Sequence, residues 1–490
     1  MLDESEQLDE SGNIVREAHR TYDVTGHTSV SLPRGFHLYS RTNYVSDITT
    51  KQLYQQNIAE SSRRDRYIGA TLNGNLGRYR LSANVEQRDA FFEEPQEDGT
   101  IEFLARRQGR MPQVNVTATE KPIGRSRLYF GLNGEMANLL SQDDLDDSTT
   151  DHSLWRFDAF PTLRFPLSKL PWLSATTAGS WRVTHWLESK DPVTQVQTNR
   201  PLTRQLLDAR LNVTGPVVSR IFQTPESGYA ERLKHLIEPN VSVRWLSPFD
   251  RTDEVVKFDG SDYEVGGTMS LNYGLTNRLL AKRKRDGKPG DVRTILTATL
   301  SQSYHTNALA AQNDPNYQSG TNQKFSPVAL DIDGRPTDHW ASRFRMELDP
   351  EFKTPRMFSL SSAYDTPNTQ VTAGWRKYYQ VSNGQPGFES NVTTHTLYAA
   401  SSFKLFQNRV GGSYGFDYDL REQAFRQQRW VGYYNAQCCG ISIDYQNAVV
   451  GAVGVPGTLT DRRFGLSFTL AGIGSFANPF GAFGDNSGRR

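Results

Sequence analysis

The sequence predicts an all-β protein, an antiparallel transmembrane β-barrel of the outer-membrane type, on three observations. Hydrophobic residues make up only 36% of the chain, yet aromatic residues make up 11%. Apolar and polar residues alternate with period two in about twenty segments of about 9–12 residues each. Polar stretches rich in Gly, Pro, Asp and Asn separate these segments. This composition is typical of a membrane barrel, in which alternate residues face lipid and aromatic girdles mark the interfaces.

The alternation recurs along the whole chain. In residues 127–136, leucine, phenylalanine and methionine occupy one face, while arginine, asparagine and glutamate occupy the other. Residues 173–184 and 292–301 repeat the pattern, with Ile295 as an exception on the polar side. A soluble sandwich packs two apolar faces around one dry core. A polar face repeated this often instead predicts apolar side chains turned outward and polar ones turned toward an enclosed lumen.

The connections predict short turns on one rim and long loops on the other. The Asn73-Gly74 step is a two-residue hairpin signal. The longer polar stretches, where we expect loops, are residues 89–110, 138–153, 187–200, 247–260 and 305–336.

No composition shift or linker divides the chain, so we expect a polar N-terminal segment at residues 1–25 and one β-barrel domain at residues 26–490. No run approaches 18 apolar residues, which predicts no transmembrane helix. The acidic start at residues 1–6 is not a secretory signal. Because an exported barrel needs one, we expect this chain to be a fragment of a longer protein.

Charge and ligand-type residues exclude several functions. The 55 basic and 54 acidic residues give a net charge of +1, so no nucleic-acid partner is expected. The nine histidines are scattered, and we expect neither a metal site nor a cofactor. The acidic run at residues 143–147 indicates a solvated loop rather than a cation site. The basic run at residues 282–288 contains Asp286-Gly287, which indicates a polar hairpin turn rather than a contact with anionic lipid headgroups.

Two features could support hydrolysis, and we interpret both as structural. Residues 411–415 match the G-x-S-x-G string around Ser413. The chemistry of that motif needs a helix after the serine, whereas a strand-like segment follows here. His235 with Glu238 is the other candidate pair. We therefore predict no catalytic residues and no enzyme activity, with a barrel phospholipase left as one alternative.

Cys438 and Cys439 are the two cysteines of the chain. Adjacent cysteines rarely bond to each other, because the small ring strains the peptide between them. In an exported protein each cysteine more naturally pairs with a distant one. Either both thiols are free, or their partners lie outside this chain.

The stretch at residues 434–445, with its Cys-Cys pair, resembles the penultimate hairpin of the LptD family, also called the organic solvent tolerance proteins. In that family the pair opens the next-to-last strand on the periplasmic rim. The resemblance runs from residue 36 to the end of the chain. Four other segments resemble family elements in the same order: Tyr44–Asp47, Pro112–Val116, His235–Pro239 and Phe464–Leu470.

The resemblance implies a translocon that places lipopolysaccharide in the outer leaflet of a Gram-negative outer membrane. It implies a complete barrel of about 26 strands, of which this chain would supply about 20. The implied partners are lipopolysaccharide, the membrane, an LptE-like plug lipoprotein and an LptA-like periplasmic bridge, reached through an N-terminal domain outside this sequence. The resemblance also implies disulfides from Cys438 and Cys439 to cysteines outside this chain.

The resemblance makes the last strand one side of a lateral seam through which the lipid leaves. Its alternate residues would face lipid and lumen in turn. Phe464, Leu466, Phe468 and Leu470 would face lipid, and Gly465, Ser467 and Thr469 the lumen. A porin or substrate-specific channel remains the main alternative, and a soluble β-rich binding protein is a further one.

Overall fold

A computed structural model describes most of the chain. The described residues are 22–46, 65–95, 101–145, 148–311, 323–380, 391–450 and 459–470, without residues 169, 286–287, 352 and 437; short strands at 2–4, 7–8, 14–16, 19–21 and 474–476 complete them. The chain divides into two compact units. The first comprises Met1–Pro166, Thr176–Arg210 and Trp245–Thr268, and the second comprises Leu167–Ala175, Leu211–Arg244 and Met269–Arg490.

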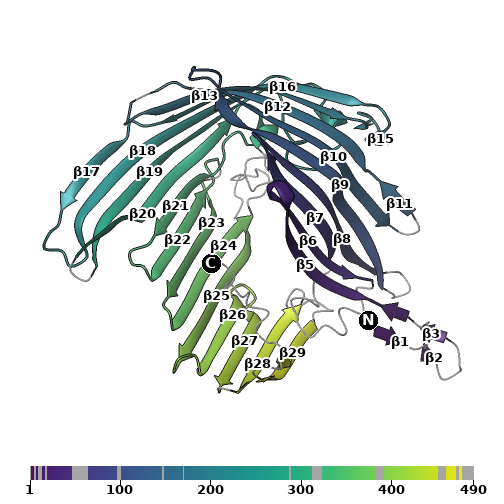
Figure 1. The fold of residues 1–490 in the computed structure, drawn as a ribbon, viewed down its shortest axis with the longest axis vertical. Helices are drawn as coiled ribbons and strands as arrows, with labels where there is room; N and C mark the ends of the chain where they lie inside the picture. Colours follow the sequence, from purple (N-terminus) through teal and green to yellow (C-terminus); the bar gives the residue numbers. More distant parts are fainter. Residues whose placement is uncertain are drawn as a thin grey trace. The chain divides into compact units, whose positions relative to one another are not determined.

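The first unit is an antiparallel sheet in which consecutive long strands pair as a meander, in the order β5-β6-β7-β8-β9-β10-β12-β13-β16 (Figure 1). Residues 211–214 of β16 and 174–175 of β13 belong to the second unit. The elements are β1 (Leu2–Glu4), β2 (Gln7–Leu8), β3 (Ile14–Arg16), β4 (His19–Thr21), β5 (Asp23–Leu32), η1 (Pro33–Gly35), β6 (Phe36–Val45), β7 (Asp65–Leu76), β8 (Tyr79–Pro95), β9 (Ile101–Pro122), β10 (Tyr129–Leu145), β11 (Ser148–Asp151), β12 (Leu154–Pro166), β13 (Ser174–Trp186), β14 (Ser189–Lys190), β15 (Gln197–Thr198), β16 (Leu202–Thr214) and η2 (Thr252–Glu254).

The second unit is a longer meander of the same kind, in which each strand from β17 to β30 pairs with the next. A short helix, α3, interrupts its described part. The elements are β17 (Val218–Gln223), β18 (Ala230–Leu246), β19 (Thr268–Arg285), β20 (Lys288–His305), α3 (Ala308–Ala311), β21 (Val328–Gly334), β22 (Trp340–Leu348), β23 (Pro355–Asp365), β24 (Thr369–Gln380), β25 (Asn391–Leu405), β26 (Val410–Asp419), β27 (Ala424–Asn435), β28 (Cys439–Val450), β29 (Leu459–Leu470) and β30 (Gly474–Phe476). Among the described residues, no helix has the length and hydropathy of a membrane span.

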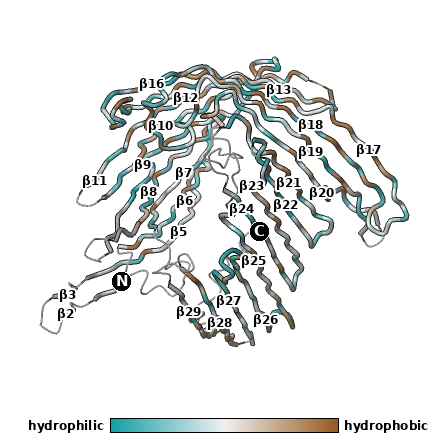
Figure 2. Tube along the Cα trace, turned by 180° about the vertical axis from the view of Figure 1, so that it is seen from behind, coloured by the Kyte–Doolittle hydropathy of each residue, from teal (hydrophilic) through white to brown (hydrophobic). Residues whose placement is uncertain are grey.

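The two faces of each sheet differ in chemistry, as the alternation predicts. Hydropathy changes back and forth along individual strands (Figure 2). On β12, Arg156 is 1% exposed, whereas the adjacent Phe157 is 39% exposed. On β16, Arg204 and Asp208 are buried, whereas Leu207 is 54% exposed. Burying arginine and exposing leucine is the reverse of a water-soluble fold.

A small apolar cluster lies on the polar face of the first unit. Two valines of the connection between β18 and β19, Val255 and Val256, are buried there against strand residues. Burying a valine side chain contributes about 1.5–3 kcal/mol. The cluster therefore fixes residues 247–267 onto the sheet. Its strand members are Ala137, Leu139, Leu154, Trp186 and Leu202, with Phe249 and Phe258 packed at its side.

The connection expected at residues 73–77 turns at the end of that stretch, so the prediction of a turn at Asn73-Gly74 is wrong. Both residues lie inside β7, and the hairpin turns at Gly77 and Arg78, where Gly77 has a φ of +62°. A positive φ suits glycine because it has no Cβ. Gly74 instead leaves room for the ring of Phe36, which a Cβ would approach to 2.2 Å.

The predicted connections are confirmed in part. Residues 247–260 form a loop, which continues to Gly267. Residues 89–110 and 138–153 lie largely in β8 to β11, because paired charges satisfy the polar side chains there. Asp143 of the acidic run, for example, pairs with Arg106 across β9 and β10 at 2.7 Å. Residues 96–100 and 146–147 lie outside the described part. The described residues of the basic run lie at the ends of β19 and β20, where Arg285 stands opposite Lys288. The predicted Asp286-Gly287 turn lies outside the described residues.

Candidate functional site

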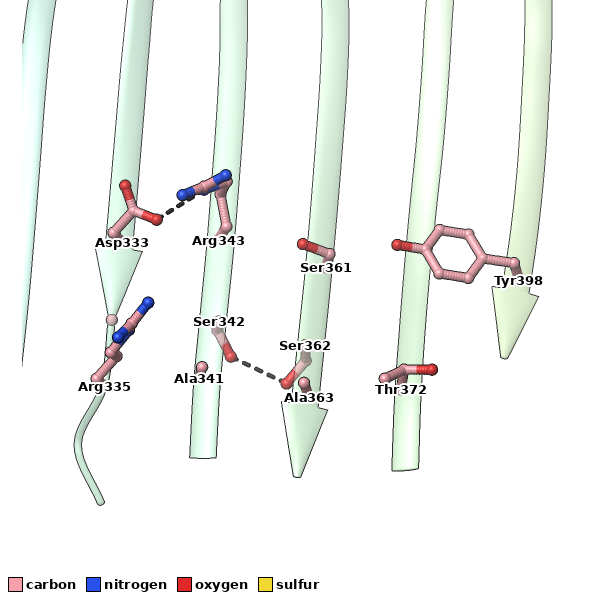
Figure 3. Close-up of a pocket in the computed structure, with 11 residues that line it drawn as sticks. Asp333, Arg335, Ala341, Ser342, Arg343, Ser361, Ser362, Ala363, Thr372 and Tyr398 are labelled. Atoms are coloured by element: carbon pink, nitrogen blue, oxygen red, sulfur yellow. Dashed lines mark hydrogen bonds and ion pairs between the residues drawn. The ribbon is translucent and has the colours of Figure 1, made fainter. Parts of the chain in front are cut away.

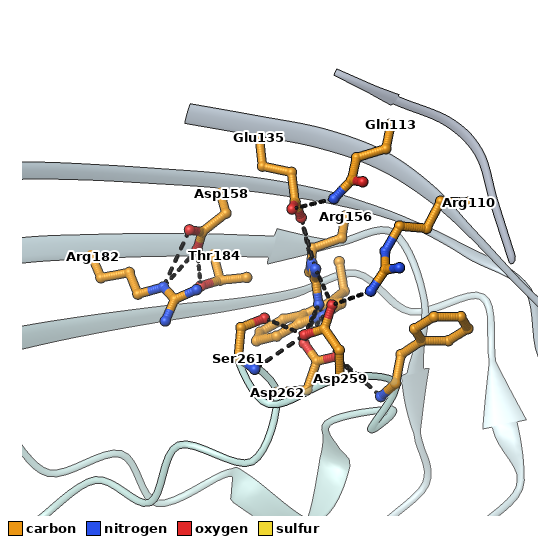
Figure 4. Close-up of polar contacts among 12 residues, drawn as sticks. Arg110, Gln113, Glu135, Arg156, Asp158, Arg182, Thr184, Asp259, Ser261 and Asp262 are labelled. Atoms are coloured by element: carbon orange, nitrogen blue, oxygen red, sulfur yellow. Dashed lines mark hydrogen bonds and ion pairs between the residues drawn. The ribbon is translucent and has the colours of Figure 1, made fainter. Parts of the chain in front are cut away.

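Arg156 on β12 is the centre of an ionic cluster on the polar face of the first unit (Figure 4). Its guanidinium contacts three carboxylates: Glu135 of β10 at 2.7 Å, Asp259 at 2.8 Å and Asp262 at 2.9 Å. The two aspartates belong to the 247–267 loop. One arginine of the sheet therefore holds the loop through contacts to two aspartates. Such charge-assisted hydrogen bonds are the strong class in proteins.

Asp262 is fully buried and organises the loop around this contact. Its carboxylate accepts hydrogen bonds from the backbone N–H groups of Phe258 (3.0 Å) and Asp259 (3.1 Å) and from the indole of Trp186 on β13 (3.2 Å). All its partners are donors, so the charged form is satisfied without water.

Asp259 is held by the same arginine and by a neighbouring serine. Burial acts to raise the pKa of its carboxyl, but the hydrogen bonds and charge of Arg156, together with the bonds from Ser261, hold that pKa well below its usual value. Arg110 of β9 adds a longer contact at 3.4 Å. The loop is therefore anchored in its charged state at neutral pH.

Further polar groups of β13 and β16 surround the loop. Arg204 donates to the backbone oxygen of Ser261 at 2.7 Å, and its guanidinium lies 4.9 Å from the ring centre of Trp186. Arg182 pairs with Asp158 at 2.9 Å (Figure 4). The arrangement positions a structured loop over charged groups on the polar face of the sheet. Its described residues do not pair a nucleophile with a base, so the site is suited to contacting a ligand on this face or covering part of the face.

Sequence reasoning missed this cluster. Arg156 and Asp262 are 106 positions apart, and neither lies in a recognisable motif. The one available signal was that Arg156 falls on the polar face of its segment.

The polar face of the second unit also carries paired charges. Arg345 of β22 contacts Glu347 at 2.7 Å and Asp331 of β21 at 3.1 Å. Arg429 of β27 contacts Asp444 of β28 at 2.6 Å. These pairs lie across or along the strands, so the face stays polar without isolated buried charge.

The predicted seam residues lie on β29, the last long strand described. Phe464, Leu466 and Phe468 are exposed on one face, and Ser467 is buried on the other. Their partners on β28 match, since the exposed Tyr445, Ile443 and Ile441 stand opposite the three exposed residues in that order. The β29 strand shares twelve residue pairs with β28 and three with β30 in the described chain. The side chains of Thr469 and Leu470 lie outside the described part.

Cys438 and Cys439 lie at the turn between β27 and β28, and both are exposed. Their sulfur atoms are 3.2 Å apart, which exceeds the bond length of about 2.05 Å in a disulfide. The pair is therefore not bonded to itself, and the structure gives no support to a disulfide within the chain. The turn is closed by a hydrogen bond from Ala436 N–H to the carbonyl of Cys439.

Ser413 and the pair of His235 and Glu238, the two candidates for hydrolysis, lie within β-strands. Ser413 lies inside β26, which continues as a strand to Asp419. His235 and Glu238 are three residues apart on β18, so their side chains point to opposite faces. Glu238 pairs with Arg278 at 3.1 Å, and His235 lies 3.3 Å from the Asn277 amide oxygen.

The model of the family LptD, LPS transport system D, matches residues 19–418. This chain belongs to the LptD family. As a member of that family, it is a transport protein of the Gram-negative outer membrane, and lipopolysaccharide is its class of substrate. The family resemblance is thereby confirmed for the matched residues, which include Tyr44–Asp47, Pro112–Val116 and His235–Pro239, whereas the cysteine hairpin at residues 434–445 and Phe464–Leu470 lie beyond them.

Several solved structures are similar to this LptD-family chain at low identity. The siderophore receptor PirA from Acinetobacter baumannii is 9% identical, with 93% of this chain and 75% of that chain covered and a TM-score of 0.35. The FrpB iron transporter from Neisseria meningitidis (F3-3 variant) is 10% identical, with 83% and 72% covered and a TM-score of 0.32. These likenesses carry no argument about function. No curated protein matches the chain in sequence.

Proposed function

We propose that this chain forms the larger part of a barrel, about 20 of about 26 strands, that inserts lipopolysaccharide into the outer leaflet. Residues 26–490 would form the barrel domain, preceded by the polar segment 1–25. The proposal depends on one observation above all: each sheet buries or pairs its charges on one face and exposes large apolar residues on the other. The first face suits an enclosed polar lumen, and the second suits hydrocarbon.

In this mechanism the sugars of the lipid cross along the polar face while its acyl chains stay in the membrane. Hydroxyl, amide and charged side chains offer donors and acceptors to a passing saccharide. In the first unit the 247–267 loop would cover part of the polar face along which the sugars pass, because Arg156 of β12 binds the loop to the sheet.

The lateral seam would use β29, with Phe464, Leu466, Phe468 and Leu470 toward lipid and Gly465, Ser467 and Thr469 toward the lumen. The exposed row of Phe464, Leu466 and Phe468 supports the lipid-facing side of this assignment. Disulfides from Cys438 and Cys439 to cysteines outside this chain, an LptE-like plug and an LptA-like bridge complete the proposal.

Photocrosslinking tests the seam. The full-length protein carrying a photoreactive residue at Phe468 is expressed in cells depleted of their own translocon, and crosslinked lipopolysaccharide is detected by immunoblot. Leu360, which is also exposed but lies on β23, serves as the matched control. We expect crosslinks at Phe468 well above those at Leu360, together with restored lipopolysaccharide at the cell surface.

A passive channel would give a different result. Ion conductance by the purified protein, with no lipopolysaccharide crosslink and no restored surface lipopolysaccharide, would overturn the translocon and favour a porin. For the cysteines, we expect both thiols in the native outer-membrane protein to resist maleimide until a reductant is added. Immediate labelling of both would refute the proposed disulfides.

A further inference from the structure

A polar pocket lies on strands β21 to β25 of the second unit, beside the charge pair of Asp331 and Arg345 (Figure 3). Its volume is about 320 Å³, at the lower end of small-ligand pockets, which span about 300–1,000 Å³. The lining residues that the argument uses are Asp333, Arg335, Arg343, Ser361, Thr372 and Tyr398.

The aromatic ring of the pocket has a fixed position. Tyr398 of β25 stands opposite Gly374 of β24, and a Cβ at Gly374 would approach the ring to 2.3 Å. The ring therefore occupies the space above a residue that has no side chain. The guanidinium of Arg376 lies 4.9 Å from the ring centre and holds it further. In Figure 3 the hydroxyl of Tyr398 points across β24 toward Ser361.

Polar groups converge beside this ring. Asp333 and Arg343 form an ion pair at 2.7 Å, and both remain substantially exposed. Ser361 and Thr372 place hydroxyl groups on the lining, and Arg335 adds a second guanidinium. With two guanidinium groups and one carboxylate among the lining residues, the local charge is positive.

We propose that this pocket binds a negatively charged sugar residue of the transported lipopolysaccharide, an inference that rests on the proposed function. A pyranose has an apolar C–H face for the tyrosine ring and hydroxyl groups for the serine and threonine. Its phosphate or carboxylate would face the arginines, which bind such groups with charge-assisted hydrogen bonds. A protein segment would need apolar anchors in the pocket, and the lining offers one aromatic ring among polar groups.

The position of the pocket fits a contact early in the path. It adjoins the connections β21–β22 and β23–β24, at residues 335–339 and 366–368. Alternate connections of a meander lie at the same edge of the sheet, so this edge also carries the turn with Cys438 and Cys439. By the family resemblance, that turn is on the periplasmic rim.

The test measures binding of the full-length protein, purified in detergent with and without its plug lipoprotein. The probe is the phosphorylated oligosaccharide released from lipopolysaccharide by mild acid, and a dephosphorylated sample is the second arm. Saturation-transfer NMR and titration calorimetry report binding. The variants are Tyr398→Leu and Arg335→Ala. Tyr433→Leu is the matched control, because Tyr433 also covers a cross-strand glycine, Gly411, but its hydroxyl is bonded to Asn408.

We expect Tyr398→Leu to weaken binding of the phosphorylated probe at least tenfold and Tyr433→Leu to change it less than twofold. Arg335→Ala should remove the preference for the phosphorylated probe. The inference would be overturned if both tyrosine variants lost binding equally or if Tyr398→Leu bound the probe as the wild-type protein does. It would also be overturned if the plug lipoprotein blocked binding completely, because the pocket would then be a protein contact. If the wild-type protein restores lipopolysaccharide at the cell surface but does not bind the probe, the pocket proposal alone is overturned. If the wild-type protein does not restore surface lipopolysaccharide, the proposed translocon function is overturned.

Discussion

Replacing Arg156 with methionine should release the 247–267 loop from the polar face. The substitution keeps a long side chain but removes the guanidinium contacts to Glu135, Asp259 and Asp262. Three carboxylates then face one another in a site where Asp262 is fully buried. Removing one partner of a buried ion pair costs about 3–5 kcal/mol.

The opening equilibrium of the loop should rise by about 100-fold to 4,000-fold, since each 1.4 kcal/mol corresponds to about tenfold. The buried valines of the loop still favour docking, so we expect frequent opening rather than unfolding of the sheet. Hydrogen exchange followed by mass spectrometry measures this directly, because the N–H groups of Phe258 and Asp259 are protected by Asp262.

Two comparisons make the result decisive. Arg210→Met removes an arginine that is 42% exposed and pairs with Asp208, and it should leave exchange in the loop unchanged. Adding Asp259→Asn and Asp262→Asn to Arg156→Met should recover part of the protection by removing the uncompensated charge. Unchanged exchange in Arg156→Met, or equal loss of protection over all strands, would refute the anchoring role of Arg156.

Three further predictions follow from the faces, the packing and the charges. Leu300→Arg should lower the free energy of unfolding of the protein in lipid vesicles by about 2–4 kcal/mol, whereas Thr299→Arg on the polar face should lower it by under about 1 kcal/mol. Denaturant titrations measure both values, and equal costs would contradict the face assignment. Gly109→Ala places a Cβ 2.1 Å from the Glu86 carbonyl oxygen and should cost about 1–3 kcal/mol in the same assay, whereas Gly179→Ala meets open space and should be near neutral. Because the pKa of Asp259 is lowered, its contribution to docking of the loop should be complete above about pH 4 and should be lost as the pH falls through that lowered pKa. Lost exchange protection between pH 7 and pH 5 would contradict this.

The faces of the strands could be predicted because a strand places successive side chains on opposite sides. That rule is local, and it identified Phe464, Leu466 and Phe468 as one exposed row. The cysteine hairpin was also recognisable, because the adjacent pair is a rare local signal. These features need no knowledge of distant contacts.

The parts that depend on distant contacts could not be predicted. The Asn73-Gly74 signal favours a turn, but a long ladder with β8 continues through it to Leu76. Residues 138–145 look like a loop because they are polar, yet Arg106 across the sheet neutralises Asp143. The tie between Arg156 and Asp262 depends on a loop folding back over the sheet, which no periodicity encodes.

The exposed apolar rows also have a consequence for the life of the protein before it reaches the membrane. Trp181, Leu207 and Phe464 would be in contact with water throughout the journey across the periplasm. Contiguous apolar surface and unpaired strands promote aggregation. We therefore expect the newly exported chain to stay bound to a holdase chaperone until it folds, and its yield in the cell should depend on how long it stays bound.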